Sequence, residues 1–270
     1  MSETESAGYF QGGLPYNRVG HGPRVVIVFQ GLMFENKPLT SFAARYNRGL
    51  YRSLEHDYTI YMVTRRPGLP DGYTLNDMAD DYAVMLTEEF GGPMHVLGLS
   101  TGGSIAQHFA ADHPELRGRL VIHYSAHTLS DEAKRIQMRA ARFAQQGNWR
   151  SANAEILRFV VPPNRAAPLL IWLGSLMMSL SAPKDPSDMV VTVEAEDKHD
   201  FKARLHQIIA PTLIVAGDQD ACYTEALFRE TAAGIPNSRL ILYEGMRHPA
   251  SGEKFGQDVL MFLREGSDKD

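Results

Sequence analysis

A serine framed by glycines stands between a predicted strand and a predicted helix. Gly98, Ser100 and Gly102 form a G-x-S-x-G motif, preceded by the apolar run 94–99 and followed by apolar residues at helical spacing. A sharp strand-to-helix turn needs small residues two before and two after the serine, because the two backbones come close together. The helix start also offers free N–H groups beside the serine. The segment predicts a nucleophile elbow.

The alternative for this segment is a glycine-rich turn without chemistry, such as a phosphate-binding loop. No lysine follows the glycines, and their spacing differs from both G-x-G-x-x-G and G-x-x-x-x-G-K. The nucleophile elbow is therefore favoured.

Apolar runs and amphipathic stretches alternate along most of the chain. We predict strands at 24–29, 58–64, 94–99, 120–124, 212–216 and 238–243, and helices at 41–54, 75–90, 101–112, 223–233 and 255–264. Strands that alternate with helices pair in parallel through right-handed crossovers. The 270 residues fit one large core of this kind. The fold class predicted is α/β, with a mostly parallel central sheet flanked by helices.

The alternation stops between residues 128 and 205. This segment is rich in Arg, Ala, Met and Leu, and its nearest strand candidate is the short run 189–193. We predict that 128–205 is a helical cap, or lid, inserted into a core made of 1–127 and 206–270, the whole forming a single structural unit. The alternative is that these are further core helices of the same sheet.

Composition excludes several classes of function. The net charge of -5 leaves no basic surface for nucleic acid, and the apolar stretch 168–180 is too short to span a membrane. Cys222 is the single cysteine, and the N-terminus lacks the features of a signal peptide, so we expect a cytoplasmic location. The partner expected is a small-molecule substrate, and no feature of the sequence specifies an oligomeric state.

Two more catalytic residue types follow predicted strands. Asp220 comes after the strand 212–216, and His248 after the strand 238–243. In an open α/β sheet, functional groups collect beyond the carboxyl ends of the strands. A serine needs a base to take its proton, and a carboxylate orients that base. The order of the three residues along the chain predicts a catalytic triad of Ser100, Asp220 and His248.

The chain resembles the α/β-hydrolase superfamily, in particular its serine esterases and lipases with a helical cap. The resemblance is carried by the segments 98–103 (GLSTGG), 211–220 (PTLIVAGDQD) and 245–248 (GMRH), and it extends over residues 15–263. It implies that the triad acid is Asp220, with Asp218 in the same turn as the alternative.

The same resemblance implies an oxyanion hole built from the backbone N–H groups of Leu32 and Thr101. The chain departs from the superfamily at Gln30, where histidine is usual before the glycine, which is kept as Gly31. The Gln30 amide either points toward the site or replaces a structural hydrogen bond. Met33, in the same loop, is a candidate substrate-binding residue.

Three further residues have two interpretations each. His127 lines the pocket or acts as a hydrogen-bonded spacer. Trp172 and Met177, in an apolar helix of the cap, form a ceiling for an acyl chain or aromatic group, or pack against the body of the protein. The histidines outside these sites have no partner at metal-ligand spacing, so we expect no metal and no cofactor.

The resemblance implies a serine hydrolase that cleaves a carboxylic ester of small to medium apolar groups through an acyl-enzyme. The alternatives are a lactonase, an amidase, a perhydrolase-like enzyme or a carbon–carbon bond hydrolase of the same fold. A small-molecule receptor with a retained triad is a further alternative. The serine at the elbow argues against the dehalogenase and epoxide-hydrolase branches, which use aspartate there.

Overall fold

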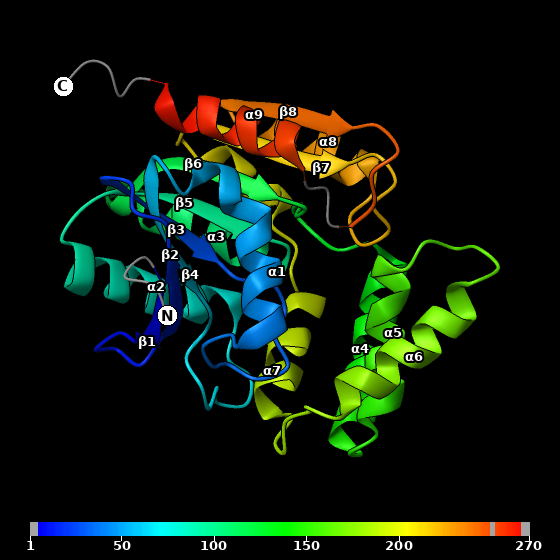
Figure 1. Ribbon diagram of the computed structural model, residues 1–270. Coiled ribbons are helices and arrows are strands. Elements are labelled where there is room, and N and C mark those ends of the chain that lie inside the picture. Colours follow the sequence, from blue (N-terminus) through cyan, green and yellow to red (C-terminus); the bar gives the residue numbers. More distant parts are fainter. Residues whose placement is uncertain (1–4, 249–251, 266–270) are drawn as a thin grey trace.

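The computed structural model describes residues 5–248 and 252–265, and its strands form one eight-stranded sheet in the order β1-β2-β4-β3-β5-β6-β7-β8 (Figure 1). The strands are β1 (Ser6–Tyr9), β2 (Pro15–Val19), β3 (Arg24–Phe29), β4 (Tyr58–Val63), β5 (Met94–Leu99), β6 (Arg117–His123), β7 (Thr212–Gly217) and β8 (Ser238–Tyr243). The α-helices are α1 (Ser41–Tyr51), α2 (Leu75–Phe90), α3 (Thr101–Asp112), α4 (Asp131–Gln145), α5 (Trp149–Val160), α6 (Ala167–Ser179), α7 (Ser187–Asp197), α8 (Glu225–Gly234) and α9 (Glu253–Arg264). Short 3-10 helices are η1 (Arg52–Leu54), η2 (Pro114–Leu116) and η3 (Lys202–Gln207).

The sheet is parallel from β4 to β8, as the alternating pattern predicts. Its first two strands differ from the prediction, because β1 and β2 add an antiparallel hairpin at the edge next to β4. The sequence pattern does not predict this hairpin. Its strands are only 4 and 5 residues long, and glycines and a proline interrupt the alternation that marks a half-buried strand.

Helices cover both faces of the sheet. Alternate residues of β3 show this division, since Ile27 and Phe29 pack with α2 and α3, whereas Val26 and Val28 pack with α1 and α9. Both sets are buried, which explains why the strand sequence is continuously apolar rather than alternating. The two cores hold the carboxyl ends of the parallel strands in fixed register, and the candidate catalytic residues lie at these ends.

The segment between β6 and β7 holds the helices α4 to α7, and α4, α5 and α6 stand beside the sheet as a separate group (Figure 1). The run 189–193, the nearest strand candidate in the sequence, is part of helix α7. Residues of α4, α5 and α7 form a small core of their own, with Ala140, Trp149 and Met189 among its members. The domain boundaries at 128 and 205 stay a prediction.

No helix in the described part of the chain has the length and apolarity needed to cross a membrane.

Candidate active site

Ser100 occupies a strained turn between β5 and α3. Its backbone has φ 52° and ψ -121°, and Ser100 is one of two residues other than glycine with positive φ among those described. The Ser100 N–H donates to His123 O at 2.8 Å, and the Ser100 carbonyl accepts from Gly103 N at 2.6 Å. Strand and helix therefore hold the residue in a conformation that it would otherwise avoid.

Glycines flanking Ser100 make this turn possible. A Cβ added to Gly98 would lie 2.5 Å from Gly103 Cα, and one added to Gly102 would lie 2.1 Å from Phe29 O. Real Cβ atoms do not approach other atoms so closely, so both positions require glycine. This agrees with the reason for which the motif needs small residues on both sides of the serine.

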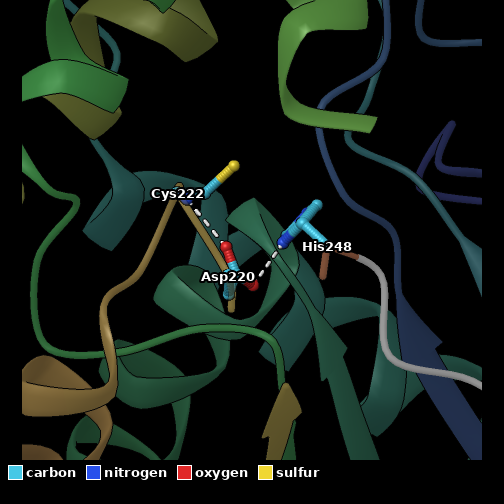
Figure 2. A group of neighbouring side chains, drawn as sticks. All are labelled: Asp220, Cys222 and His248. Carbon is cyan, nitrogen blue, oxygen red and sulfur yellow. Dashed lines mark hydrogen bonds and ion pairs between the residues drawn. The ribbon is translucent and has the colours of Figure 1, made fainter. Parts of the chain in front are cut away.

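Asp220 and His248 form a hydrogen-bonded pair at the ends of neighbouring strands. Asp220 follows β7, His248 follows β8, and His248 Nδ1 donates to Asp220 Oδ2 at 2.7 Å (Figure 2). The other oxygen, Asp220 Oδ1, accepts from the N–H groups of Cys222 at 2.7 Å and Tyr223 at 3.2 Å. With Nδ1 engaged by the carboxylate, His248 Nε2 is left to exchange a proton.

Asp218, the alternative acid, has a different partner. Its Oδ1 accepts from Gly245 N at 2.8 Å, which ties the loop after β7 to the loop after β8. Asp220, in contrast, is buried and bonded to the imidazole. The geometry favours Asp220 as the acid partner of His248.

The loop after β3 lies directly against the elbow. A Cβ added to Gly31 would lie 3.4 Å from Ser100 Cβ, so the backbone before Leu32 passes beside the serine. The Leu32 side chain packs against the core of the inserted helices. Within the residues that the structure describes, no hydrogen bond joins Ser100 Oγ to His248. In enzymes without substrate this contact is often long and tightens on binding.

A buried arginine, Arg65, binds the backbone of the same loop. Its Nη1 donates to Gln30 O at 2.9 Å, and its Nη2 donates to Gly31 O at 2.9 Å. Burial lowers the pKa of Arg65, and the charges of Glu196 and Asp188 act in the opposite direction. The guanidinium thus fixes two consecutive carbonyls next to the predicted oxyanion donor Leu32.

A buried carboxylate, Glu196, contacts the first turn of α3, directly after the elbow. Its Oε2 accepts from Thr101 Oγ1 at 2.5 Å, and its Oε1 accepts from Ser104 Oγ at 3.0 Å and Tyr223 OH at 2.7 Å. Burial raises the pKa of Glu196, while these hydrogen bonds and the charge of Arg65 lower it. Glu196 comes from α7, so the segment between β6 and β7 contacts the helix that follows Ser100.

Neither Arg65 nor Glu196 is among the residues predicted from the sequence, although each leaves a signal there. Arg65 follows β4 at the same carboxyl edge as Ser100, where functional groups collect. Glu196 lies three residues after Val193 and seven after Met189, which is the spacing of one buried helix face. The second signal is visible only once the segment is recognised as a helix.

Gln30 is buried, and its backbone joins the sheet through a bond from Gln30 N to Val63 O at 2.9 Å. Its Nε2 atom has no hydrogen-bond partner in the described part of the chain, which does not support a structural hydrogen bond from that atom. Met33, further along the loop, is half-buried.

His127 lies against helix α8. Its backbone N and its Nδ1 both contact Thr231 Oγ1, at 2.9 and 3.1 Å, and the residue is buried. Burial lowers the pKa of His127, so the ring is neutral near pH 7. These contacts favour the hydrogen-bonded spacer over the pocket-lining residue.

Trp172 and Met177 lie on α6, whose bulky apolar side chains point outward. Trp172 is 51% exposed and Met177 is 70% exposed, which does not support packing of these side chains against the body. The helix packs on α5 instead, through smaller residues such as Gly174 and the buried Ser175. Their role in binding substrate stays a prediction.

One group of potential metal ligands exists among residues 5–248 and 252–265. Donor atoms of Asp220, Cys222 and His248 lie within 4.8 Å of one another (Figure 2). Burial raises the pKa of the Cys222 thiol well above its usual value, so it is protonated at neutral pH. The carboxylate and the imidazole already bind each other, an arrangement suited to proton transfer.

Comparison with known proteins defines the class. The family model described as "Alpha/beta hydrolase family" matches residues 21–255, and the chain belongs to this family. A 2-hydroxy-6-oxononadienedioate/2-hydroxy-6-oxononatrienedioate hydrolase from Pseudomonas sp. is 25% identical over 95% of this chain and 93% of the relative. A putative carbamate hydrolase from Serratia proteamaculans is 26% identical over 68% of this chain and 69% of its own.

A solved structure of a hydrolase from Pseudomonas aeruginosa PA01 has the same fold. It superimposes with a TM-score of 0.76 at 22% identity, covering 97% of this chain and 99% of that chain. The α/β-hydrolase fold predicted from the sequence is thereby confirmed.

Proposed function

We propose that this protein is a serine hydrolase that cleaves a carboxylic ester with small to medium apolar groups. The observation that carries the proposal is the 2.7 Å hydrogen bond between His248 and Asp220, formed at the same sheet edge as the strained turn of Ser100. Nucleophile, base and acid come from three separate strand ends, which is the arrangement that acyl transfer needs.

In this mechanism Ser100 Oγ attacks the substrate carbonyl, and His248 takes the serine proton and passes it to the leaving alcohol. Asp220 keeps the imidazole in the required tautomer and stabilises its positive charge. The Leu32 and Thr101 N–H groups stabilise the oxyanion, and water then hydrolyses the acyl-enzyme. No cofactor is needed for these steps.

A fluorophosphonate probe and p-nitrophenyl esters test the proposal. The wild-type protein is expected to be labelled at Ser100 and to turn over p-nitrophenyl butyrate repeatedly, whereas a Ser100→Ala variant does neither. Labelling that persists in the variant would falsify the assignment of the nucleophile. A single equivalent of product without further turnover would support the receptor alternative.

Carbon–carbon bond hydrolysis is the second candidate, supported by the full-length similarity to the dienedioate hydrolase. The compound in that name contains carboxylate, hydroxyl and keto groups but no ester or amide, so its hydrolysis must split a carbon–carbon bond. The same serine could attack the keto carbon. The test substrate is a vinylogous diketone that carries the same hydroxyl, keto and carboxylate groups. If the protein hydrolyses it faster than p-nitrophenyl butyrate, this candidate is favoured over the esterase.

A further inference from the structure

We propose that Arg65 and Glu196 are positioning residues that orient the two N–H groups of the oxyanion hole, Arg65 acting on Leu32 and Glu196 on Thr101. The inference rests on the proposed function, since it concerns the same site. Neither residue belongs to the proposed triad, and both are buried.

The Arg65 half of the proposal follows from peptide geometry. The Gly31 carbonyl and the Leu32 N–H belong to one peptide unit, and in a trans peptide they point in opposite directions. Arg65 Nη2 binds Gly31 O at 2.9 Å, so the Leu32 N–H must point away from the guanidinium. The second bond, from Arg65 Nη1 to Gln30 O, prevents the preceding peptide from rotating.

The Glu196 half rests on side-chain hydrogen bonds that hold the first turn of α3, to which Thr101 belongs. The Ser100 carbonyl accepts from the N–H groups of Gly103 and Ser104, so the Thr101 N–H in the same peptide points the other way. The remaining freedom of Thr101 lies in its side chain, which Glu196 Oε2 binds at 2.5 Å. A second bond from Ser104 Oγ to Glu196 Oε1 holds the first turn of α3.

Glu196 also connects the elbow to the acid loop. Tyr223 OH donates to Glu196 Oε1 at 2.7 Å, and the backbone N of Tyr223 donates to the Asp220 carboxylate at 3.2 Å. One carboxylate therefore contacts the helix that follows Ser100 and the loop that carries Asp220. A displacement of Glu196 would move both.

Arg65 and Glu196 are both buried, and the charge of Arg65 lowers the pKa of Glu196. Buried charges are seldom the most stable choice for a core, because well-packed apolar residues commonly do as well or better. Here the charged groups supply what apolar residues cannot, namely hydrogen bonds to two carbonyls and to three hydroxyls. Such hydrogen bonds are typical of residues that hold catalytic donors in a fixed direction, here the N–H groups of Leu32 and Thr101.

The experiment compares Glu196→Gln and Arg65→Lys with the wild type and with Glu194→Gln, a control on the half-buried side of the same helix. We expect both test variants to lower kcat for p-nitrophenyl butyrate at least about tenfold, part of the about 10²–10³-fold that loss of an oxyanion donor costs. KM should change less than about twofold, since the oxyanion forms only in the transition state. Fluorophosphonate labelling of Ser100 should slow in parallel.

A second pair of variants covers the case in which the first ones do not fold. Thr101→Val removes the hydroxyl that binds Glu196 and keeps the side-chain shape, whereas Thr101→Ser keeps the hydroxyl. Thr101→Val should reproduce the loss of kcat, and Thr101→Ser should retain most of the wild-type kcat. A merely structural role predicts that both variants act through melting temperature, with kcat recovering when the assay is cooled.

The outcomes separate the two proposals. A folded Glu196→Gln or Thr101→Val variant with unchanged kcat and unchanged labelling overturns the positioning role and leaves the serine hydrolase intact. A rise in KM of these variants at constant kcat also overturns the positioning role, because the residues would then act in substrate binding. A wild-type protein that is not labelled at Ser100 overturns both.

Discussion

His248 Nδ1 donates to Asp220 Oδ2 at 2.7 Å, across two loops whose residues are 28 positions apart in sequence. Parallel pairing of β7 with β8 brings the two loops to the same edge of the sheet. The imidazole is thus oriented by a carboxylate that is itself fixed by two backbone N–H groups.

Asp220→Asn should lower kcat for ester hydrolysis by about 10³–10⁴-fold, because the amide favours the wrong tautomer of His248. Asp218→Asn is the matched control, since Asp218 binds the backbone of Gly245 and not the imidazole. Its effect on kcat should be less than about tenfold if it acts only through loop stability. Steady-state kinetics on both variants decide the matter, and a larger loss in Asp218→Asn would reverse the assignment.

Gly102→Ala should destabilise the protein by at least about 3 kcal/mol, because its Cβ would overlap the backbone oxygen of Phe29. Gly49→Ala is the control, since Gly49 is exposed in α1 and a Cβ there meets no atom within 4 Å. That substitution should stabilise the protein by about 0.5–1 kcal/mol. Urea unfolding measures both, and equal midpoints would contradict the close approach of strand and helix.

Arg65→Met should cost about 1–3 kcal/mol of stability, because it leaves the carbonyls of Gln30 and Gly31 without their donors and removes the positive charge that lowers the pKa of Glu196. The double variant Arg65→Met/Glu196→Gln should recover part of that loss. A double-mutant cycle by chemical denaturation measures the coupling. Strictly additive effects would show that the two charges do not interact.

Stability should decline as the pH falls below about 6.5, because several buried or half-buried histidines resist protonation in the folded state. Burial lowers the pKa of His95 to about 4, that of His108 to about 4 and that of His199 to about 3, from an ordinary value of 6.5. The unfolded chain therefore binds protons between pH 6.5 and 4 that the folded chain does not. Protons favour unfolding in this window, and the stability is complete above it.

Melting temperatures between pH 7.5 and 4.5 test this expectation. His95 Nδ1 accepts from the backbone N of Arg119 at 3.0 Å, a bond that protonation breaks. His95→Gln should therefore lose less stability over this range than the wild type, while the exposed His56→Gln should follow the wild type. Identical slopes for all three proteins would contradict the prediction.

The sequence predicts the parallel part of the fold well because its signals are local. β5, α2 and α3 begin and end at the predicted residues. Strand β6 starts earlier than predicted, at Arg117. Its first three residues are two arginines and a glycine, which interrupt the apolar pattern of a buried strand. The β1–β2 hairpin depends on pairing with β4, a long-range contact that a local pattern does not encode.

Local patterns in the sequence also predict part of the candidate site. Asp220 and His248 each follow an apolar strand, and the structure brings them together. Arg65 and Glu196 act through hydrogen bonds across 34 and 95 positions of sequence, to Gly31 and Thr101. Such contacts depend on three-dimensional packing, and no spacing rule relates their partners.

Helix α7 is joined by two of its carboxylates to loops at the carboxyl edge of the sheet. Its Asp188 accepts from Gly68 N and Leu69 N at 2.9 Å, and its Glu196 binds the elbow. A chimaera that exchanges the inserted helices with those of another hydrolase therefore has a natural joint before Ser187. Exchanging α4 to α6 alone would leave these hydrogen bonds in place, whereas an exchange that includes α7 would also remove the Glu196 carboxylate that binds Thr101 and Ser104.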